Sequence, residues 1–231
     1  MDSLFVLVHS PLVGPLTWAL VADELRRRGQ RVLVPELASP AEAPFWPHHI
    51  DSVARTLADL SAVAPVVLVG HSGAGPLLPG IARATGRPVS GYIFVDAGLP
   101  TDGESRMSSG GFAGYLRDLY ARGKRFPNWQ EQDLRDVVPD PALRARLIAE
   151  LRPQPLAFWK EHLPVIDGWP DAQCAYLQFT PTYDADAEQA RWLGWPYRHL
   201  QGGHFHMLVD PAGTTDVLLE LTHGIRVVPN R

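Results

Sequence analysis

The chain contains a single cysteine and no long apolar run. Cys174 cannot form a disulfide within one chain, which suits a reducing compartment. The apolar run 4–8 is too short for a signal peptide, and no stretch reaches the roughly 18 apolar residues that a membrane helix needs. We therefore expect a soluble, cytoplasmic protein with no membrane partner.

Charge is also evenly spread, with 21 basic and 25 acidic residues and no long run of either sign. Nucleic-acid binding needs a concentrated basic patch, so we expect no nucleic-acid partner. The sequence shows no cluster of metal ligands and no phosphate-binding glycine loop, so we expect no metal and no cofactor. The expected partner is a small-molecule substrate, and the oligomeric state is left open.

The apolar content is large enough for one well-buried core. Of the 231 residues 45% are apolar and 20% charged, so we expect a single α/β domain over residues 1–231. Apolar strands alternate with helical patterns, which predicts a mostly parallel sheet of about six strands with helices on both faces. Strands are expected at 4–8, 31–34, 66–69, 91–95, 175–180 and 197–200, and helices at 16–28, 49–63, 75–85, 184–193 and 214–223.

Residues 99–170 interrupt this alternation before the fifth expected strand. The segment is long and rich in proline and aromatic residues, with helical patterns at 112–122 and 142–151. We interpret it as an inserted helical cap and call it the cap segment. Four of its aromatic residues are candidates for an apolar substrate pocket: Phe112, Tyr115, Trp129 and Trp159.

The strongest motif is Gly70-His71-Ser72-Gly73-Ala74, which lies between an apolar strand and a helical pattern. Small residues around a serine let a strand turn sharply into a helix, which exposes the hydroxyl. The motif resembles the nucleophile elbow of the α/β-hydrolase fold superfamily, in its capped branch of esterases and hydroxynitrile lyases. The resemblance covers nearly the whole chain and implies that Ser72 is the nucleophile.

The resemblance also implies a histidine base in the loop after the last strand. The sequence Gly202-Gly203-His204-Phe205-His206-Met207 fits the family's Gly-His-X-X-Met pattern at His204. Phe205 and His206 are further candidates for the substrate pocket.

Two aspartates compete for the role of the acid that orients His204. Asp184 follows the fifth expected strand, where many members of the superfamily carry the acid, but it lacks the usual Gly-X-Asp pattern. Asp96 ends the fourth strand, where haloalkane dehalogenases and some esterases of this fold place theirs. We prefer Asp96 and keep Asp184 as the alternative.

The oxyanion hole departs from the family pattern. One donor is expected to be the amide of Gly73, and the other usually comes from X of a His-Gly-X sequence after the first strand. Here the sequence is His9-Ser10-Pro11-Leu12, and a proline at X has no N–H to donate. Hydroxynitrile lyases of the same fold carry a hydroxyl residue at the position of Ser10, so we expect Ser10 to contact the substrate oxygen. His9, Pro11, Leu12 and His71 are further candidates for the pocket wall.

These residues predict a serine hydrolase that cleaves an ester or thioester of a small, largely apolar molecule through an acyl-Ser72 intermediate. One alternative is a lyase or cyclase in which His204 is the general base and Ser72 and Ser10 relay a proton or contact an oxygen. Another alternative is a catalytically silent receptor for a small ligand.

Overall fold

The computed structural model describes residues 3–60, 64–101, 111–164 and 166–225. In this part of the chain six strands form one sheet in the order β2-β1-β3-β4-β5-β6, and each neighbouring pair is parallel. The predicted parallel sheet is thus confirmed, with each strand within two residues of its expected ends. The strands are β1 (Leu4–Val8), β2 (Arg31–Leu33), β3 (Val66–His71), β4 (Val89–Val95), β5 (Cys174–Gln178) and β6 (Tyr197–His199).

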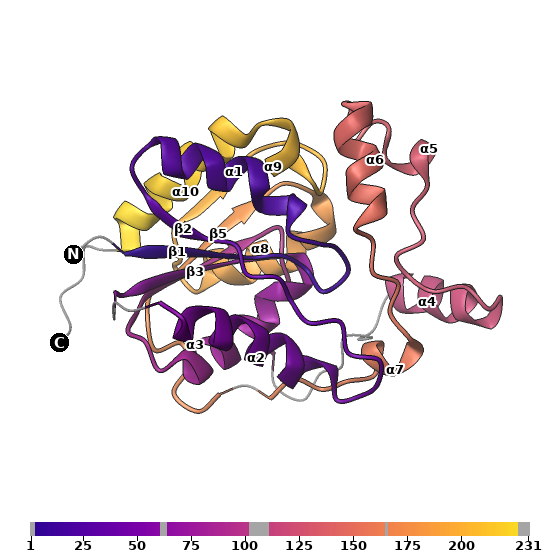
Figure 1. Cartoon of the computed structure of the whole chain (residues 1–231), viewed down its shortest axis with the longest axis horizontal. Helices are drawn as coiled ribbons and strands as arrows, with labels where there is room; N and C mark the ends of the chain where they lie inside the picture. Colours follow the sequence, from indigo (N-terminus) through magenta and orange to yellow (C-terminus); the bar gives the residue numbers. More distant parts are fainter. Residues whose placement is uncertain (1–2, 61–63, 102–110, 165, 226–231) are drawn as a thin grey trace.

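Helices cover both faces of the sheet, as its apolar strands require (Figure 1). Along β1, Phe5 and Leu7 face one apolar cluster, whereas Val6 and Val8 face the other. The first cluster includes α1 (Leu16–Arg27), α9 (His206–Val209) and α10 (Pro211–Ile225). The second includes α2 (Phe45–Ala58), α3 (Leu78–Thr85) and α8 (Asp184–Trp192).

Two helices differ most from the sequence prediction. The helix expected at 49–63 begins earlier, at Phe45, where the carboxylate of Glu161 accepts its first two N–H groups. It ends at Ala58, and residues 61–63 lie outside the described ranges. The helix expected at 75–85 is divided into the 3₁₀ segment η1 (Ser72–Leu77) and α3. Pro76, which has no N–H, lies inside the 3₁₀ part.

The described part of the cap segment contains four short helices beyond the carboxyl ends of the strands (Figure 1). They are α4 (Gly111–Ala121), α5 (Glu131–Leu134), α6 (Pro141–Ala149) and α7 (Leu156–Trp159). Residues 102–110 and 165 of the segment lie outside the described ranges. None of the helices within those ranges has the length and apolar character that crossing a bilayer requires.

Candidate active site

Ser72 lies at the sharp turn between β3 and η1. Its φ of +56° is a left-handed conformation, which a residue other than glycine adopts only when its surroundings compel it. The turn is crowded, because a Cβ atom at Gly75 would lie 2.2 Å from the carbonyl oxygen of Gly98. Only glycine fits at position 75 without a backbone shift. The strand, turn and helix therefore present Ser72 at the carboxyl edge of the sheet.

His204 and Asp96 meet at the same edge, in the loops after β6 and β4. His204 Nδ1 donates a hydrogen bond of 2.7 Å to Oδ2 of Asp96, which is fully buried. The carboxylate also accepts hydrogen bonds from the N–H groups of Phe179 (2.9 Å) and Thr180 (2.8 Å) and from the Thr180 hydroxyl (2.9 Å). These donors offset the cost of burying the charge. Because Nδ1 carries the proton, Nε2 of neutral His204 is a base.

Asp184, the alternative acid, lies elsewhere. It begins α8, is exposed to solvent, and accepts a hydrogen bond of 2.6 Å from the side-chain amide of Gln178. Within the described ranges the carboxylate that contacts His204 is that of Asp96.

Two residues that the sequence analysis missed hold Asp96 in place. Thr180 supplies two of its hydrogen bonds, and Tyr176 binds the next residue along the chain. The Tyr176 hydroxyl donates to the carbonyl of Ala97 (2.7 Å) and accepts from its N–H (3.2 Å). Asp96 itself has a φ of +42°, so this clamp holds a strained turn. No local pattern signals these contacts, because they join residues 79 and 84 positions apart in sequence.

Tyr183 is a third residue that the sequence analysis missed. It ends the 3₁₀ turn η2 (Pro181–Tyr183) after β5, and its hydroxyl shares a hydrogen bond of 3.1 Å with Oγ of Ser72. Its ring is nearly parallel to that of His204, with an interplanar angle of 18° and centroids 5.6 Å apart. The only sequence signal is its place in the loop where many superfamily members carry the acid.

The loop after β1 is held by several hydrogen bonds. The carbonyl of Ser10 accepts from the N–H of Val13 (3.1 Å), and the Ser10 hydroxyl accepts from the N–H of Leu12 (3.4 Å). The carbonyl of Pro11 accepts from the side-chain amide of Gln154 in the cap segment (2.9 Å). Ser10 is 2% exposed, so its hydroxyl lies in a protected position.

Two buried histidines lie at this edge of the sheet, one in this loop and one at the end of β3. His9 Nδ1 donates to the carbonyl of Ser10 (2.9 Å), and its Nε2 accepts from the N–H of Leu37 (3.2 Å); burial lowers the pKa of His9 to about 4. His71 Nε2 donates to the carbonyl of His204 (2.9 Å), and burial holds the pKa of His71 well below its ordinary value. Both rings are therefore neutral near pH 7, and His71 supports the backbone of His204.

Residues 5–217 match the family model described as the alpha/beta hydrolase family. The chain belongs to the alpha/beta hydrolase family. Its members present a nucleophile at the turn after a central strand, the position of Ser72 in this alpha/beta hydrolase.

Individual relatives are more distant. A curated relative, the carbendazim hydrolyzing esterase of Nocardioides sp. (strain SG-4G), is 30% identical over 111 residues, which make up 45% of this chain and 46% of that protein. This alpha/beta hydrolase thus matches less than half the length of that relative.

Two solved structures share the fold over almost their whole length. An extracellular alpha/beta-hydrolase from a Paenibacillus species, described as homologous to tobacco Salicylic Acid Binding Protein 2, has a TM-score of 0.77 and 21% identity and covers 95% of this chain and 99% of its own. A variant of tomato Methylketone Synthase I complexed with beta-ketoheptanoate has a TM-score of 0.73 and 15% identity, over 97% and 99% of the two chains.

The predicted pocket aromatics of this alpha/beta hydrolase form a chain of ring contacts between the cap segment and the site. Trp129 contacts Phe205, the neighbour of His204, with ring centroids 5.6 Å apart. Leu12 packs in the same apolar cluster as Trp159, which is almost fully buried. The remaining two, Phe112 and Tyr115, are 47% and 45% exposed and stack on each other at the outer end.

His206 is a predicted pocket residue that does not contact the two proposed reacting side chains. Its ring packs edge-on against Phe179, and it makes no hydrogen bond with Ser72 or His204 in the described structure. Within the described ranges no group of three or more metal-ligating side chains occurs.

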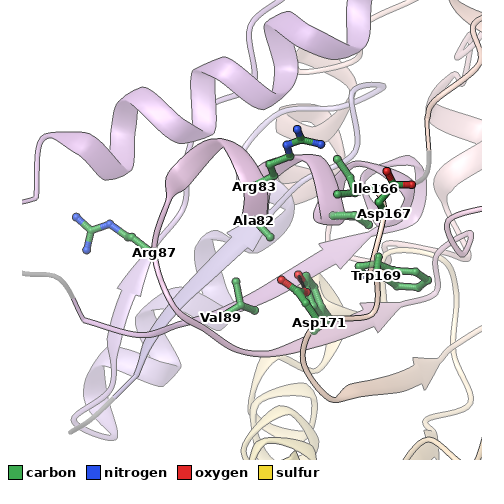
Figure 2. A pocket seen from close by; sticks show the side chains of 10 residues that line it. Ala82, Arg83, Arg87, Val89, Ile166, Asp167, Trp169 and Asp171 are labelled. Atoms are coloured by element: carbon green, nitrogen blue, oxygen red, sulfur yellow. Dashed lines mark hydrogen bonds between the residues drawn. The ribbon is translucent and has the colours of Figure 1, made fainter.

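A hollow of about 420 Å³ lies away from the site (Figure 2). Val89, at the amino end of β4, lines it together with Ala82 and Arg83 of α3 and with Trp169 and Asp171. Ser72, His204 and Asp96 instead follow the carboxyl ends of their strands. The hollow is therefore separate from the candidate active site.

Proposed function

We propose that this chain is a serine esterase that cleaves an ester or thioester of a small, largely apolar molecule through an acyl-Ser72 intermediate. The observation that carries the proposal is the 2.7 Å hydrogen bond between His204 and buried Asp96, beside a serine held at a strained turn. The partial likeness to a carbendazim hydrolyzing esterase supports the same class of reaction.

In this proposal His204 Nε2 removes the proton of Ser72 as Oγ attacks the substrate carbonyl. The carbon–oxygen or carbon–sulfur bond to the leaving group then breaks, and His204 returns the proton to the departing atom. Water next attacks the acyl group, again losing a proton to His204, and the bond to Oγ breaks. Asp96 stays ionised throughout and stabilises the imidazolium that forms twice in each cycle.

The oxyanion hole is proposed to consist of the Gly73 amide and the Ser10 hydroxyl. Because Leu12 N–H donates to Ser10 Oγ, the Ser10 proton points elsewhere, and no acceptor for it occurs among the described residues. A buried O–H of this kind can donate to the negative oxygen of the tetrahedral intermediate. It would replace the N–H that Pro11 lacks.

The size and polarity of the site support a small, apolar acyl group. Ser72 is 5% exposed and the side chain of His204 is 24% exposed, so little room is open around the reacting atoms. Leu12, Phe205 and the cap aromatics supply apolar surface on that side.

The test is labelling with a fluorophosphonate, followed by intact mass, on the wild type and on the Ser72→Ala and His204→Ala variants. We expect one adduct on the wild type, none on Ser72→Ala, and labelling of His204→Ala slower by at least about 1,000-fold. A folded wild-type chain that takes up no label contradicts the proposal.

A non-hydrolytic lyase or cyclase is a second candidate, favoured by one observation. Pro11 removes the usual oxyanion N–H, and Ser10 places a hydroxyl there instead. In this reaction His204 would remove a proton from carbon or oxygen of the substrate, and Ser72 would relay it. A folded chain without fluorophosphonate labelling would direct attention to this class.

A further inference from the structure

Tyr183 contacts the reacting atoms of the site, yet the proposed mechanism assigns it no step. Its hydroxyl lies 3.1 Å from Ser72 Oγ, and its ring stacks along the imidazole of His204. In the described structure the Ser72 hydroxyl makes this hydrogen bond with Tyr183 and none with His204. Tyr183 is thus as close to the nucleophile as a substrate atom would be.

The direction from which Tyr183 approaches decides which substrate atom it can meet. Tyr183 follows β5, whereas Ser10 follows β1, and these two strands lie on opposite sides of β3 in the sheet. Ser10 and Tyr183 therefore belong to loops that follow strands on opposite sides of β3. Ser10 lies on the side proposed for the carbonyl oxygen, and Tyr183 lies on the side of His204, where the leaving group must receive its proton.

The phenol of Tyr183 keeps its proton at neutral pH. Burial, together with the nearby carboxylates of Asp96 and Asp186, raises the pKa of Tyr183 above its ordinary value, and the hydrogen bond with Ser72 only partly opposes this. The group is therefore a hydrogen-bond donor at neutral pH.

We propose that Tyr183 is a further catalytic residue, whose hydroxyl donates a hydrogen bond to the leaving-group oxygen during acylation and to the oxygen of the hydrolytic water during deacylation. The inference rests on the proposed esterase function. The leaving-group oxygen and Oγ are bonded to the same carbon in the tetrahedral intermediate, so a donor that reaches Oγ can reach both.

The step needs no other reactant. During acylation the bond from Oγ to carbon forms and the bond from carbon to the alcohol oxygen breaks. The serine proton passes to His204 and then to the alcohol. Tyr183 donates only a hydrogen bond and retains its proton, which stabilises the negative charge that develops on the departing oxygen. In deacylation water occupies the place of the alcohol, and the same bond orients it.

The experiment compares two esters of one acid in wild type and Tyr183→Phe. Ethyl butyrate has a poor leaving group, whereas p-nitrophenyl butyrate releases a phenolate that departs readily without a hydrogen-bond donor. We expect Tyr183→Phe to lower kcat/KM about 100-fold for ethyl butyrate and less than about threefold for p-nitrophenyl butyrate. Because both esters form the same butyryl-Ser72, kcat for p-nitrophenyl butyrate should fall while its kcat/KM is kept.

Tyr92→Phe is the matched control, because it removes a buried hydroxyl that binds Asp171 (2.6 Å) beside the hollow of Figure 2, away from Ser72. It should leave both esters unchanged, and thermal midpoints show whether each variant is folded. If Tyr183→Phe lowers kcat/KM equally for both esters, or for neither, the proposed role of Tyr183 is wrong. Labelling of the wild type by fluorophosphonate would still support the esterase function in that case. A wild type that is neither labelled nor active overturns both.

Discussion

Buried polar side chains of the candidate site are held by specific hydrogen-bond partners. Four hydrogen bonds reach the two oxygens of fully buried Asp96. His9 is neutral because burial lowers its pKa, and both of its ring nitrogens have hydrogen-bond partners, the carbonyl of Ser10 and the N–H of Leu37. At the residue scale, the site is thus preorganised by groups far apart in sequence.

Replacing each candidate acid by asparagine should show which of the two orients His204. Asp96→Asn should lower kcat/KM for p-nitrophenyl butyrate by about 10⁴-fold, because an amide at this position favours the wrong tautomer of His204. Asp184→Asn, an exposed change of the same chemistry, should stay within about threefold of wild type. Full activity in Asp96→Asn together with loss in Asp184→Asn would reverse the assignment.

His9 should make the fold sensitive to acid. Unfolded His9 takes up a proton near its ordinary pKa of 6.5, whereas burial lowers its pKa to about 4 in the fold. Between these values the unfolded state binds more protons, so the free energy of unfolding falls as the pH falls, by up to about 1.4 kcal/mol per unit. From pH 7.5 to 5.0 this amounts to about 2 kcal/mol from His9.

Urea unfolding at pH 7.5 and 5.0 measures this dependence. His9→Asn keeps a donor for Ser10 but cannot titrate, so it should be less stable than wild type at pH 7.5 and lose less on acidification. His48→Asn, at an exposed histidine, should behave as wild type. If His9→Asn and wild type lose the same free energy of unfolding between the two pH values, His9 does not carry the effect.

At the scale of elements, two helices receive their N-terminal caps from the cap segment. Pro15 precedes α1 and Pro44 precedes α2, and neither residue has a side chain that can accept a hydrogen bond. Instead Oε2 of Glu150 accepts the N–H of Leu16 at 2.9 Å, and the carboxylate of Glu161 accepts the first two N–H groups of α2. Negative charge also favours a helix N-terminus.

Removal of one such cap should destabilise the whole fold. Glu150→Ala should lower the free energy of unfolding by about 1 kcal/mol, since it leaves the first N–H of α1 without its carboxylate. Chemical denaturation at pH 7.5 would measure the loss. Glu188→Ala, an exposed change within α8, is the control and should shift stability by less than about 0.5 kcal/mol. Equal effects in the two variants would argue against capping.

At the scale of the whole molecule, the cap segment and the sheet share both polar and apolar contacts. Arg152 donates from its backbone to the carbonyl of Leu12 (2.9 Å) and from its guanidinium to that of Leu37 (2.7 Å). Leu12 and Phe45 from outside the segment pack in one cluster with its aromatic residues. We therefore expect the cap segment and the sheet to unfold together.

The single cysteine makes this expectation measurable. Cys174 is buried in the sheet, so the urea concentration at which its thiol reacts reports unfolding of the sheet. Ala113→Cys in a Cys174→Ala chain places a thiol at a buried position of α4 and reports the cap segment. The two thiols should become reactive over the same urea range. Earlier reaction at position 113 would show that the cap segment unfolds on its own.

The sequence by itself determined the parallel sheet, its strands and the edge at which Ser72 and His204 lie. Continuous apolar strands, glycine stops and the small residues around Ser72 are local patterns, so they can be recognised without coordinates. The start of α2 could not be predicted in this way, because its cap comes from Glu161, 116 residues away from Phe45 in sequence.

Only the tertiary structure decided which carboxylate meets His204 and that Tyr183 meets Ser72. Asp96 and Asp184 both follow a strand, and their spacing in sequence does not separate them. Asp96 contacts His204 because the N–H groups of Phe179 and Thr180 converge on it at the boundary between β4 and β5. The N–H groups converge because strands far apart in the chain pair with each other. The free energy that favours Asp96 over Asp184 beside His204 is distributed over contacts between distant residues, so no local sequence pattern reveals it.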